Sequence, residues 1–197
     1  LCAEPSLKID TYHYTDLSAA FLTHGRVEYD APFLAFDRLD ISNCVEQQGF
    51  EPQSYDMVIC GNVLHATADI GKTLGNAKAL LKPGGYLIGC EVAQNALYTH
   101  LTFGLLEGWW AVEDPHMRLL GCPGLTSEGW RIALILAGFC NIGFPASHMH
   151  SLGQQIFVAQ SDGVLHDVMP RKAVSMPQGP LPTQDTPLMH APPLTPH

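Results

Sequence analysis

The sequence predicts an α/β domain built on a mostly parallel, doubly wound sheet. Apolar segments of strand length alternate with segments of helix length, an order that places parallel strands side by side with helices on their faces. The clearest unit is an apolar run at residues 57–60 that ends in Gly61-Asn62, where a small and a polar residue allow a ligand to approach the carboxyl end of a strand. A helix then runs to Lys82-Pro83-Gly84-Gly85, which is a stop signal before the next strand.

The other elements follow the same alternation along the chain. Thr126-Ser127-Glu128 offers a polar start to a late helix, and Gly138 offers its end. We expect strands at 9–16, 33–40, 55–61, 86–92, 141–144 and 154–160, and helical segments at 18–28, 70–81, 97–106 and 127–137.

Length and composition favour one domain followed by a tail. With 197 residues and 46% hydrophobic content, the chain can bury one sizeable core, which we place at residues 1–160. Residues 161–197 contain eight of the fifteen prolines, so they predict a disordered tail or linker, with a proline-rich docking ligand as the alternative.

Charge and cysteine usage narrow the classes of partner and compartment. A formal net charge of −9, with only ten Lys and Arg, argues against a nucleic-acid partner. The longest apolar run, at 132–140, is too short for a membrane helix, and residues 1–10 lack the features of a signal peptide. The six cysteines are widely spaced, which indicates free thiols in a reducing cytoplasm. The chain starts with Leu instead of Met, so we expect that residues preceding it were removed or not recorded.

Several motifs together resemble one family. Lys-Pro-Gly-Gly alone is shared by many methyltransferases, whereas His-Ala-Thr combined with Gly-Trp-Trp is more specific. Over residues 9–160 the order and spacing resemble the C-methyltransferase domain of fungal polyketide synthases, highly reducing or non-reducing. This resemblance implies a Rossmann-like, class I S-adenosylmethionine-dependent methyltransferase sheet. The motifs are Tyr14-Thr15-Asp16-Leu17-Ser18, Gln48-Gly49-Phe50-Glu51, Asn62-Val63-Leu64-His65-Ala66-Thr67, Leu81-Lys82-Pro83-Gly84-Gly85, Gly108-Trp109-Trp110, and Trp130 with Gly138-Phe139.

The resemblance implies where S-adenosylmethionine would bind. Asp16, with Leu17, ends a predicted strand, where a carboxylate can accept both ribose hydroxyls; the alternative is that Asp16 caps the next helix. Asp40 and Ile41 would face the adenine. Cys60, Gly61 and Asn62 would lie along the methionine part, although small residues for packing and an Asn for a turn are the alternative.

The same resemblance implies a catalytic pair, His65 and Glu91. Both follow or end neighbouring predicted strands, so they would meet at one edge of the sheet. A neutral imidazole is a suitable base for removing a proton from the carbon between a ketone and a thioester. The carboxylate would hold the ring in one tautomer and stabilise the imidazolium. A lone histidine at such a position more often has a structural role.

Residues 104–124 are too mixed in character for a core segment. Trp109 and Trp110 would lie near the acyl substrate, in a loop that closes over it; a hydrophobic plug for the helical layer is the alternative. His148 and His150 lack a third ligand, so we expect no metal site.

Two features of the family are absent from this sequence. No strand with a glycine-rich turn precedes the Tyr-Thr-Asp segment, and the N-terminal tyrosine that the family uses near the substrate lies outside the chain. We therefore expect a domain truncated at its N-terminus. The expected function is methylation of the α-carbon of a β-ketoacyl polyketide intermediate on an acyl carrier protein, beside other polyketide synthase domains, in secondary metabolism. The alternative is a non-catalytic remnant or scaffold. A nicotinamide-dependent reductase lacks both Gly-x-Gly-x-x-Gly and Tyr-x-x-x-Lys.

Overall fold

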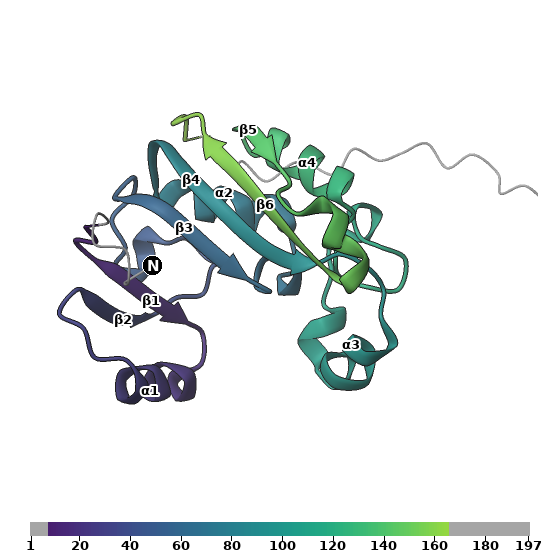
Figure 1. The fold of residues 1–197 in the computed structure, drawn as a ribbon, viewed down its shortest axis with the longest axis horizontal. Coiled ribbons are helices and arrows are strands. Elements are labelled where there is room, and N and C mark those ends of the chain that lie inside the picture. The colour runs from purple at the N-terminus through teal and green to yellow at the C-terminus, as the bar shows by residue number, and fades with distance from the viewer. Residues whose placement is uncertain (1–7, 166–197) are drawn as a thin grey trace, which may run out of the picture.

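The computed structural model describes residues 8–165, which form two sheets (Figure 1). Strands β1 and β2 pair in parallel, and the other four strands form a separate sheet in the order β3-β4-β6-β5. The strands are β1 (Tyr12–Asp16), β2 (Leu34–Arg38), β3 (Tyr55–Gly61), β4 (Leu81–Val92), β5 (Phe139–Gly143) and β6 (Gln154–Ser161). The helices are α1 (Ala19–Glu28), α2 (Ile70–Leu80), α3 (Leu97–Thr102) and α4 (Ser127–Leu136).

The four-stranded sheet is mixed, whereas the alternation of elements predicts a mostly parallel one. β3 and β4 run in parallel, whereas β6 is antiparallel to both β4 and β5. β3, β4 and β5 therefore point the same way. The register pairs Gly61 with Cys90, so the carboxyl ends of β3 and β4 lie side by side.

Helices α2 and α4 cover one face of this sheet and form the core with it (Figure 1). Leu74 of α2 and Trp130 of α4 are fully buried in the same cluster as Leu87 and Phe157 of the strands. A Cβ at Gly89 would lie 2.2 Å from the Phe157 ring, so only glycine lets that ring cross β4. This packing fixes β4, which carries Glu91.

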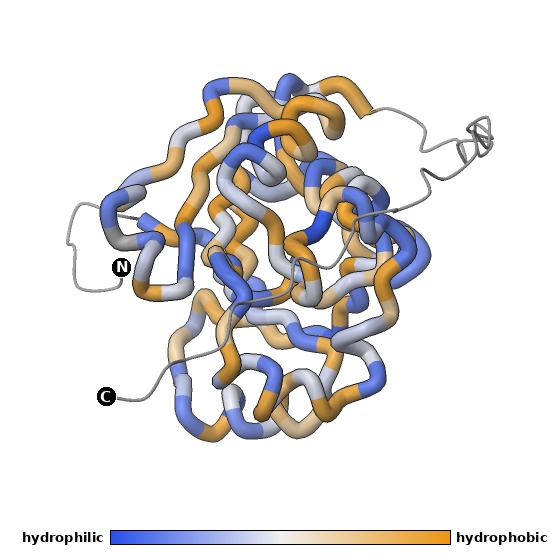
Figure 2. The backbone as a smooth tube through the Cα atoms, turned by 90° about the vertical axis from the view of Figure 1, so that its right-hand side faces the viewer, coloured by the Kyte–Doolittle hydropathy of each residue, from blue (hydrophilic) through white to orange (hydrophobic). Residues whose placement is uncertain are grey.

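The opposite face of the sheet exposes apolar side chains. Met57 and Ile59 of β3, Tyr86 of β4 and Ile156 of β6 are 38–50% exposed. Figure 2 shows apolar residues on outer turns of the chain as well as in its interior. Apolar exposure is also high around α3, where Leu97 is 74% exposed.

The small sheet of β1 and β2 packs against α1 and stays separate from β3. Leu22 and Gly25 of α1 are buried, and a Cβ on Gly25 would come within 3.0 Å of the Phe36 ring. Side chains link this unit to the larger sheet, because His13 Nδ1 lies 2.7 Å from the Tyr55 hydroxyl. No backbone pairing joins β1 to β3 within residues 8–165.

The helix positions agree with the predicted ones to within one residue at most ends. Thr126 Oγ1 accepts a hydrogen bond from the Gly129 N–H at 2.9 Å, and Gly138 takes a φ of 82° just after α4. In contrast, the helical stretch predicted at 97–106 is divided, since α3 ends at Thr102 and a 3₁₀ helix follows (Phe103–Leu105).

Four strand boundaries differ from the prediction by two residues or more. β1 begins at Tyr12 instead of residue 9, and β2 ends at Arg38 instead of residue 40. β4 begins at Leu81 instead of residue 86, because residues 82–85 bulge out between two paired segments; the register passes from Tyr55↔Leu81 to Met57↔Tyr86. Gly84 has a φ of 78° inside this bulge, which explains why the sequence there resembles a turn. β5 begins at Phe139, two residues before the predicted strand.

The described residues also bear on membrane helices, metal ligands and cysteines. Within residues 8–165 no helix is long and apolar enough to cross a membrane. The same part of the chain contains no group of three His, Cys, Asp or Glu side chains placed to hold a metal ion. Its five cysteines are free thiols. Most of the predicted tail, residues 166–197, lies outside the described residues.

Candidate active site

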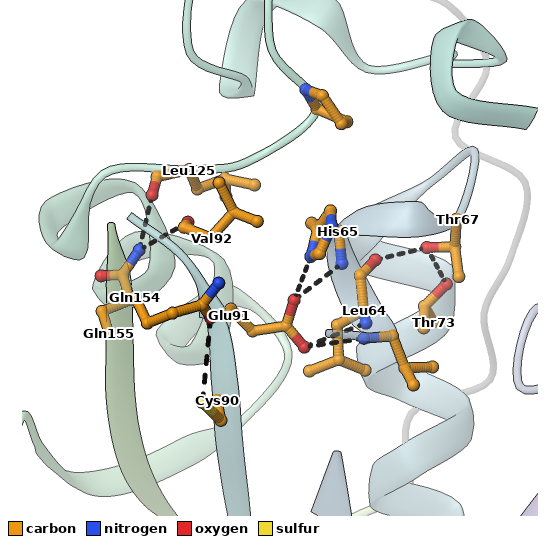
Figure 3. Close-up of polar contacts among 12 residues, drawn as sticks. Leu64, His65, Thr67, Thr73, Cys90, Glu91, Val92, Leu125, Gln154 and Gln155 are labelled. Carbon is orange, nitrogen blue, oxygen red and sulfur yellow. Dashed lines mark hydrogen bonds and ion pairs between the residues drawn. The ribbon is translucent and has the colours of Figure 1, made fainter. Parts of the chain in front are cut away.

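His65 and Glu91 are in direct contact at the adjoining ends of β3 and β4 (Figure 3). His65 Nδ1 lies 2.5 Å from Glu91 Oε2, and the two residues are 3% and 0% exposed. The structure thus brings together the two residues that the resemblance implies as a pair, and it buries both.

The backbone after β3 turns so that the carboxylate of Glu91 receives several N–H groups. Asn62 takes a φ of 52°, its N–H donates to the Cys90 carbonyl at 2.7 Å, and a 3₁₀ helix (Leu64–Ala66) follows. Glu91 Oε1 accepts from the N–H groups of Val63 (3.3 Å) and Leu64 (3.1 Å), and Oε2 accepts from the His65 N–H (3.2 Å). The carboxylate therefore positions both the ring and the peptide of His65 (Figure 3).

These contacts determine the tautomer of His65. A carboxylate can only accept hydrogen bonds, so the proton of the neutral ring lies on Nδ1. Nε2 is then left with its lone pair and can accept a proton. The arrangement is that of a base with a carboxylate that orients it.

A buried ion pair holds the same loop from the other side. Arg118 donates to the carbonyl oxygens of His65 (2.8 Å) and Thr67 (2.9 Å), and its Nε lies 2.6 Å from Asp114 Oδ1. Asp114 Oδ2 accepts from the Ile70 N–H, the first residue of α2, at 2.8 Å. No role is predicted for this pair from the sequence, where its only signal is two opposite charges four residues apart.

Trp109 packs against the ring of His65, whereas Trp110 does not. The Trp109 indole meets His65 edge to face, with ring centroids 5.6 Å apart, and it stacks on Phe103 at 5.7 Å. Trp109 is 6% exposed and Trp110 is 53% exposed. Trp110 stacks on His100 at 5.5 Å, and its Nε1 donates to the Gly104 carbonyl. Of the two predicted substrate residues, Trp109 alone contacts the His65 ring.

The loop that carries these tryptophans borders a cavity of about 290 Å³. Its wall includes Trp109, Trp110, Arg118 and the segment 119–123. The buried Nδ1 of His100 and Nε1 of Trp109 have no hydrogen-bond partner among the described residues. His100 was not anticipated from the sequence, and its Nε2 lies 2.5 Å from Asn95 Oδ1.

The two predicted nucleoside carboxylates follow β1 and β2, and each binds the turn after its own strand. Asp16 Oδ1 accepts from the Ser18 N–H at 2.7 Å, as the capping alternative predicts, and Oδ2 is left for another donor. Asp40 Oδ1 and Oδ2 accept from the Ser42 N–H (2.9 Å) and from Asn43 Nδ2 (2.8 Å). Leu17 is 53% exposed, which leaves its side chain available to a ligand.

Ile41 is part of the protein core, in addition to its predicted contact with a ligand. It is 8% exposed, belongs to the core cluster, and its carbonyl accepts from Asn76 Nδ2 at 2.8 Å. The tip of the loop after β2 is thereby tied to α2.

The end of β3 combines a buried thiol with an open backbone. Cys60 is 7% exposed, and burial, with a smaller contribution from the nearby Glu91 charge, raises the pKa of its thiol to about 12. A Cβ added to Gly61 would meet no atom within 4 Å. The strand end therefore has room for a ligand beside Gly61 and Asn62, which fits the methionine part of S-adenosylmethionine.

Comparisons of sequence relate this chain to methyltransferases and polyketide synthases. Residues 3–87 match the model described as a methyltransferase domain. The chain is 47% identical over 174 residues to the polyketide synthase PksM of Bacillus subtilis, covering 85% of this chain and 4% of that protein. It is 43% identical over 133 residues to the compactin diketide synthase MlcB of Penicillium citrinum, covering 66% of this chain and 5% of the synthase. The chain thus corresponds to a small part of each relative.

Solved structures agree with this relationship. The DszA carbon methyltransferase is 36% identical with a TM-score of 0.73, covering 79% of this chain and 41% of that one. The trans-methyltransferase CalH, solved in complex with SAH, is 31% identical with a TM-score of 0.66, covering 77% and 42%. The fold is that of class I S-adenosylmethionine-dependent methyltransferases, and the chain resembles carbon methyltransferases in sequence as well.

The specifically fungal origin that the motifs suggested is not supported. Four bacterial synthases match this chain at 40–48% identity over 78–85% of its length. They are PksM and PksR of Bacillus subtilis and ThaG and ThaQ of Burkholderia thailandensis. The fungal synthases match over a shorter part of the chain. Bacterial and fungal synthases both match this chain, so the matches do not assign it to one of the two groups.

Proposed function

We propose that this chain carries the base of an S-adenosylmethionine-dependent C-methyltransferase that acts on the α-carbon of a β-ketoacyl polyketide intermediate. The buried His65–Glu91 pair is the observation that supports this proposal most directly. An α-carbon flanked by a ketone and a thioester must lose a proton before it can attack a methyl group, and the pair offers a base where β3 and β4 end.

The proton is transferred from the α-carbon to His65 Nε2. Glu91 keeps the other ring nitrogen protonated and stabilises the imidazolium that forms. The enolate left on the substrate is the nucleophile. Its carbon would form the new bond to the methyl group, while the bond from that methyl group to the donor sulfur would break and leave both electrons on the sulfur. General-base assistance of this kind contributes roughly 10²- to 10⁴-fold in rate.

S-adenosylmethionine, when bound, would supply the methyl group on a sulfonium. The residues that would hold it are Asp16 and Leu17 after β1, Asp40 and Ile41 after β2, and Cys60, Gly61 and Asn62 at the end of β3. The free Asp16 oxygen and the open space at Gly61 are suited to this. Alignment of donor and acceptor is the main requirement of the transfer itself.

The acyl chain would enter beside Trp109. The ring of this residue is already against His65, while Trp110 lines the same cavity farther out. The substrate would be presented by an acyl carrier protein, in the cytoplasm and next to other polyketide synthase domains, as in the synthases that this chain resembles.

A second candidate is a methyltransferase-like domain that does not use the cofactor. Its support is the separation of the β1–β2 sheet from β3, since Asp16 and Asn62 then lie on different sheets. The hydrogen bonds of Glu91 to the ring and backbone of His65 favour the enzyme. A domain without catalytic function has no need of a buried histidine whose Nε2 is kept as an acceptor.

Calorimetric titration of the full-length protein with S-adenosylmethionine separates the two candidates. The enzyme is expected to bind the donor and to methylate a β-ketoacyl carrier protein. His65→Ala should lower the methylation rate roughly 10²- to 10⁴-fold and change the donor affinity by no more than a few-fold. Absence of heat up to millimolar donor would favour the second candidate, and methylation by His65→Ala at the wild-type rate would remove His65 as the base.

A further inference from the structure

Charged side chains hold the peptide of His65 at both its N–H and its carbonyl. The N–H donates to Glu91 Oε2 at 3.2 Å, and the carbonyl accepts from Arg118 Nη1 at 2.8 Å. Only a 3₁₀ helix of three residues, Leu64–Ala66, carries His65 between the two contacts. Regular secondary structure alone therefore does not fix the position of the ring.

Each guanidinium N–H of Arg118 has an acceptor. Nη1 also donates to the Pro123 carbonyl at 2.8 Å, and Nη2 donates to the carbonyls of Thr67 (2.9 Å) and Ala68 (3.4 Å). Nε lies 2.6 Å from Asp114. Arg118 thus joins the loop after β3 to the segment that follows the two tryptophans.

Asp114 fixes the guanidinium in turn. The side chains of Arg118 and Asp114 are 3% and 10% exposed, and the second oxygen of Asp114 accepts from the Ile70 N–H at the start of α2. A buried Arg–carboxylate pair with these additional hydrogen bonds holds one geometry much better than an exposed pair does.

We propose that Arg118 is a positioning residue for the reaction. It holds the peptide of His65 in the position from which Nε2 can reach the α-carbon of the substrate. This inference rests on the proposed role of His65 as the base. Arg118 itself does not touch the substrate carbon in this role, because its donors are occupied by backbone carbonyls and Asp114. Misplacement of a catalytic group by about 1 Å can lower a rate on the order of 10²-fold.

Lysine cannot replace this arginine. A guanidinium presents five donors in a rigid plane, whereas an ammonium presents three from a point at the end of a flexible stem. Arg118→Lys keeps the charge but leaves some of the carbonyls of His65, Pro123, Thr67 and Ala68 without a donor. Asp114→Asn is the milder change, because the amide oxygen can still accept from the Ile70 N–H.

The test compares Arg118→Lys and Asp114→Asn in the full-length protein. Arg131→Lys is the matched control, since Arg131 also pairs with a carboxylate on its own helix, Glu128, but at 3.8 Å and at the surface. We expect Arg118→Lys to lower kcat roughly 10- to 100-fold, with KM for S-adenosylmethionine within about two-fold. Asp114→Asn should show a smaller loss of kcat, and Arg131→Lys none.

Two further readouts separate positioning from general stability. Hydrogen exchange of the backbone amides in residues 62–69 should accelerate in Arg118→Lys and Asp114→Asn and stay unchanged in Arg131→Lys. In a His65→Ala background, Arg118→Lys should cause no further loss of the residual rate, because its effect acts through His65. An equal loss in both backgrounds, or wild-type kcat and exchange in the two variants, would overturn the positioning role.

The same design shows which proposal has failed. If His65→Ala methylates normally, the proposed function falls, while the exchange measurement still reports whether Arg118 fixes the loop. Should Arg118→Lys fail to fold, Asp114→Asn decides the matter, since it removes the charged partner that fixes the guanidinium and keeps Arg118 itself. A wild-type kcat with unchanged exchange in that variant also overturns the positioning role.

Discussion

Two regions of this molecule are built differently: the dyad region, around His65 and Glu91, and the proposed nucleoside region, around Asp16 and Asp40. At the ends of β3 and β4, Glu91 accepts four hydrogen bonds from residues 63–65. Arg118, which is 53 residues away in the sequence, donates to the His65 carbonyl of the same loop. At β1 and β2, by contrast, the carboxylates of Asp16 and Asp40 bind only the turn after their own strand among the described residues, and their strands form a sheet apart from β3. Long-range contacts thus position the proposed base, whereas local turns position the two carboxylates proposed to bind the cofactor.

This difference indicates how each region should respond to mutation. Changes in the dyad region should affect both folding and rate, because its polar groups are buried and mutually bound. Changes to the carboxylates of Asp16 and Asp40 should affect donor affinity and leave the fold intact, because among the described residues the hydrogen bonds of these carboxylates stay within the turn that follows.

Glu91→Gln should give the largest effect and would break the dyad region. The amide presents an NH₂ group in place of one acceptor oxygen, so one or more of the N–H groups of Val63, Leu64 and His65 loses its partner and the His65 tautomer is no longer fixed. We expect methylation to fall roughly 10²- to 10⁴-fold. Each buried N–H group left without an acceptor should also lower the free energy of unfolding by roughly 1 to 3 kcal/mol.

Rate assays and urea unfolding measure these two effects of Glu91→Gln. Asp56→Asn is the control, since Asp56 pairs with Lys82 at the surface. A variant that keeps the wild-type rate would show that the carboxylate does not orient the base.

Asp16→Asn should give the second largest effect. It tests the nucleoside region separately from the dyad region. The amide oxygen can still accept from the Ser18 N–H, so α1 keeps its start, but the charge and one acceptor are lost. We expect affinity for S-adenosylmethionine to fall on the order of 10-fold to 100-fold, the value of a hydrogen bond to a charged group. At saturating donor, kcat should be unchanged. Calorimetry and steady-state kinetics check the two parts, and equal donor affinity in variant and wild type would remove Asp16 from the site.

Gly61→Ala tests whether the donor passes the end of β3. A Cβ there has open space in the structure, so the melting temperature should stay the same, while a bound ligand would meet the new methyl group. We expect about a 10-fold loss of donor affinity, by analogy with overpacking of a fitted site. Gly143→Ala is the matched control, because its Cβ is equally unobstructed and it lies on β5. An unchanged affinity in Gly61→Ala would place the donor elsewhere.

Cys60 should give the smallest effect at neutral pH and a clear one in alkali. Its thiol has a folded pKa of about 12 against an ordinary value of 9.0, so above pH 9 the unfolded chain releases a proton that the folded chain keeps. The contribution of Cys60 to stability is complete below pH 9 and is lost between pH 9 and 12, at about 1.4 kcal/mol per pH unit.

Urea unfolding at pH 8 and pH 10.5 measures this loss. The wild type should lose more free energy of unfolding over that interval than Cys60→Ala does. Cys140→Ala, which removes an exposed thiol, should behave as the wild type. Parallel pH dependence in the wild type and Cys60→Ala would contradict the raised pKa.

The two regions also differ in how far the sequence could predict them. Strand ends are marked by where apolar runs stop, which puts Asp16 at the end of its strand from local patterns alone. The pairing of His65 with Glu91 is implied by the family resemblance, since the two residues are 26 positions apart in the sequence. The partners of Arg118 lie about 50 residues away at the His65 loop, and no local pattern specifies which carbonyls a guanidinium will find.

Other differences have similar physical causes. The bulge at residues 82–85 looks like a turn because Gly84 needs a positive φ, although strand pairing continues on both sides. Trp109 and Trp110 are adjacent and chemically identical, so only tertiary packing decides that one contacts His65 and the other stacks on His100.

Exchange of the α-proton of a β-ketoacyl thioester in D₂O, without any methyl donor, tests most directly whether His65 is a base held by Glu91. The wild-type protein should accelerate the exchange, and both His65→Ala and Glu91→Gln should bring it down to the rate without protein. Acceleration that survives in His65→Ala would contradict the account, whatever the protein does with S-adenosylmethionine.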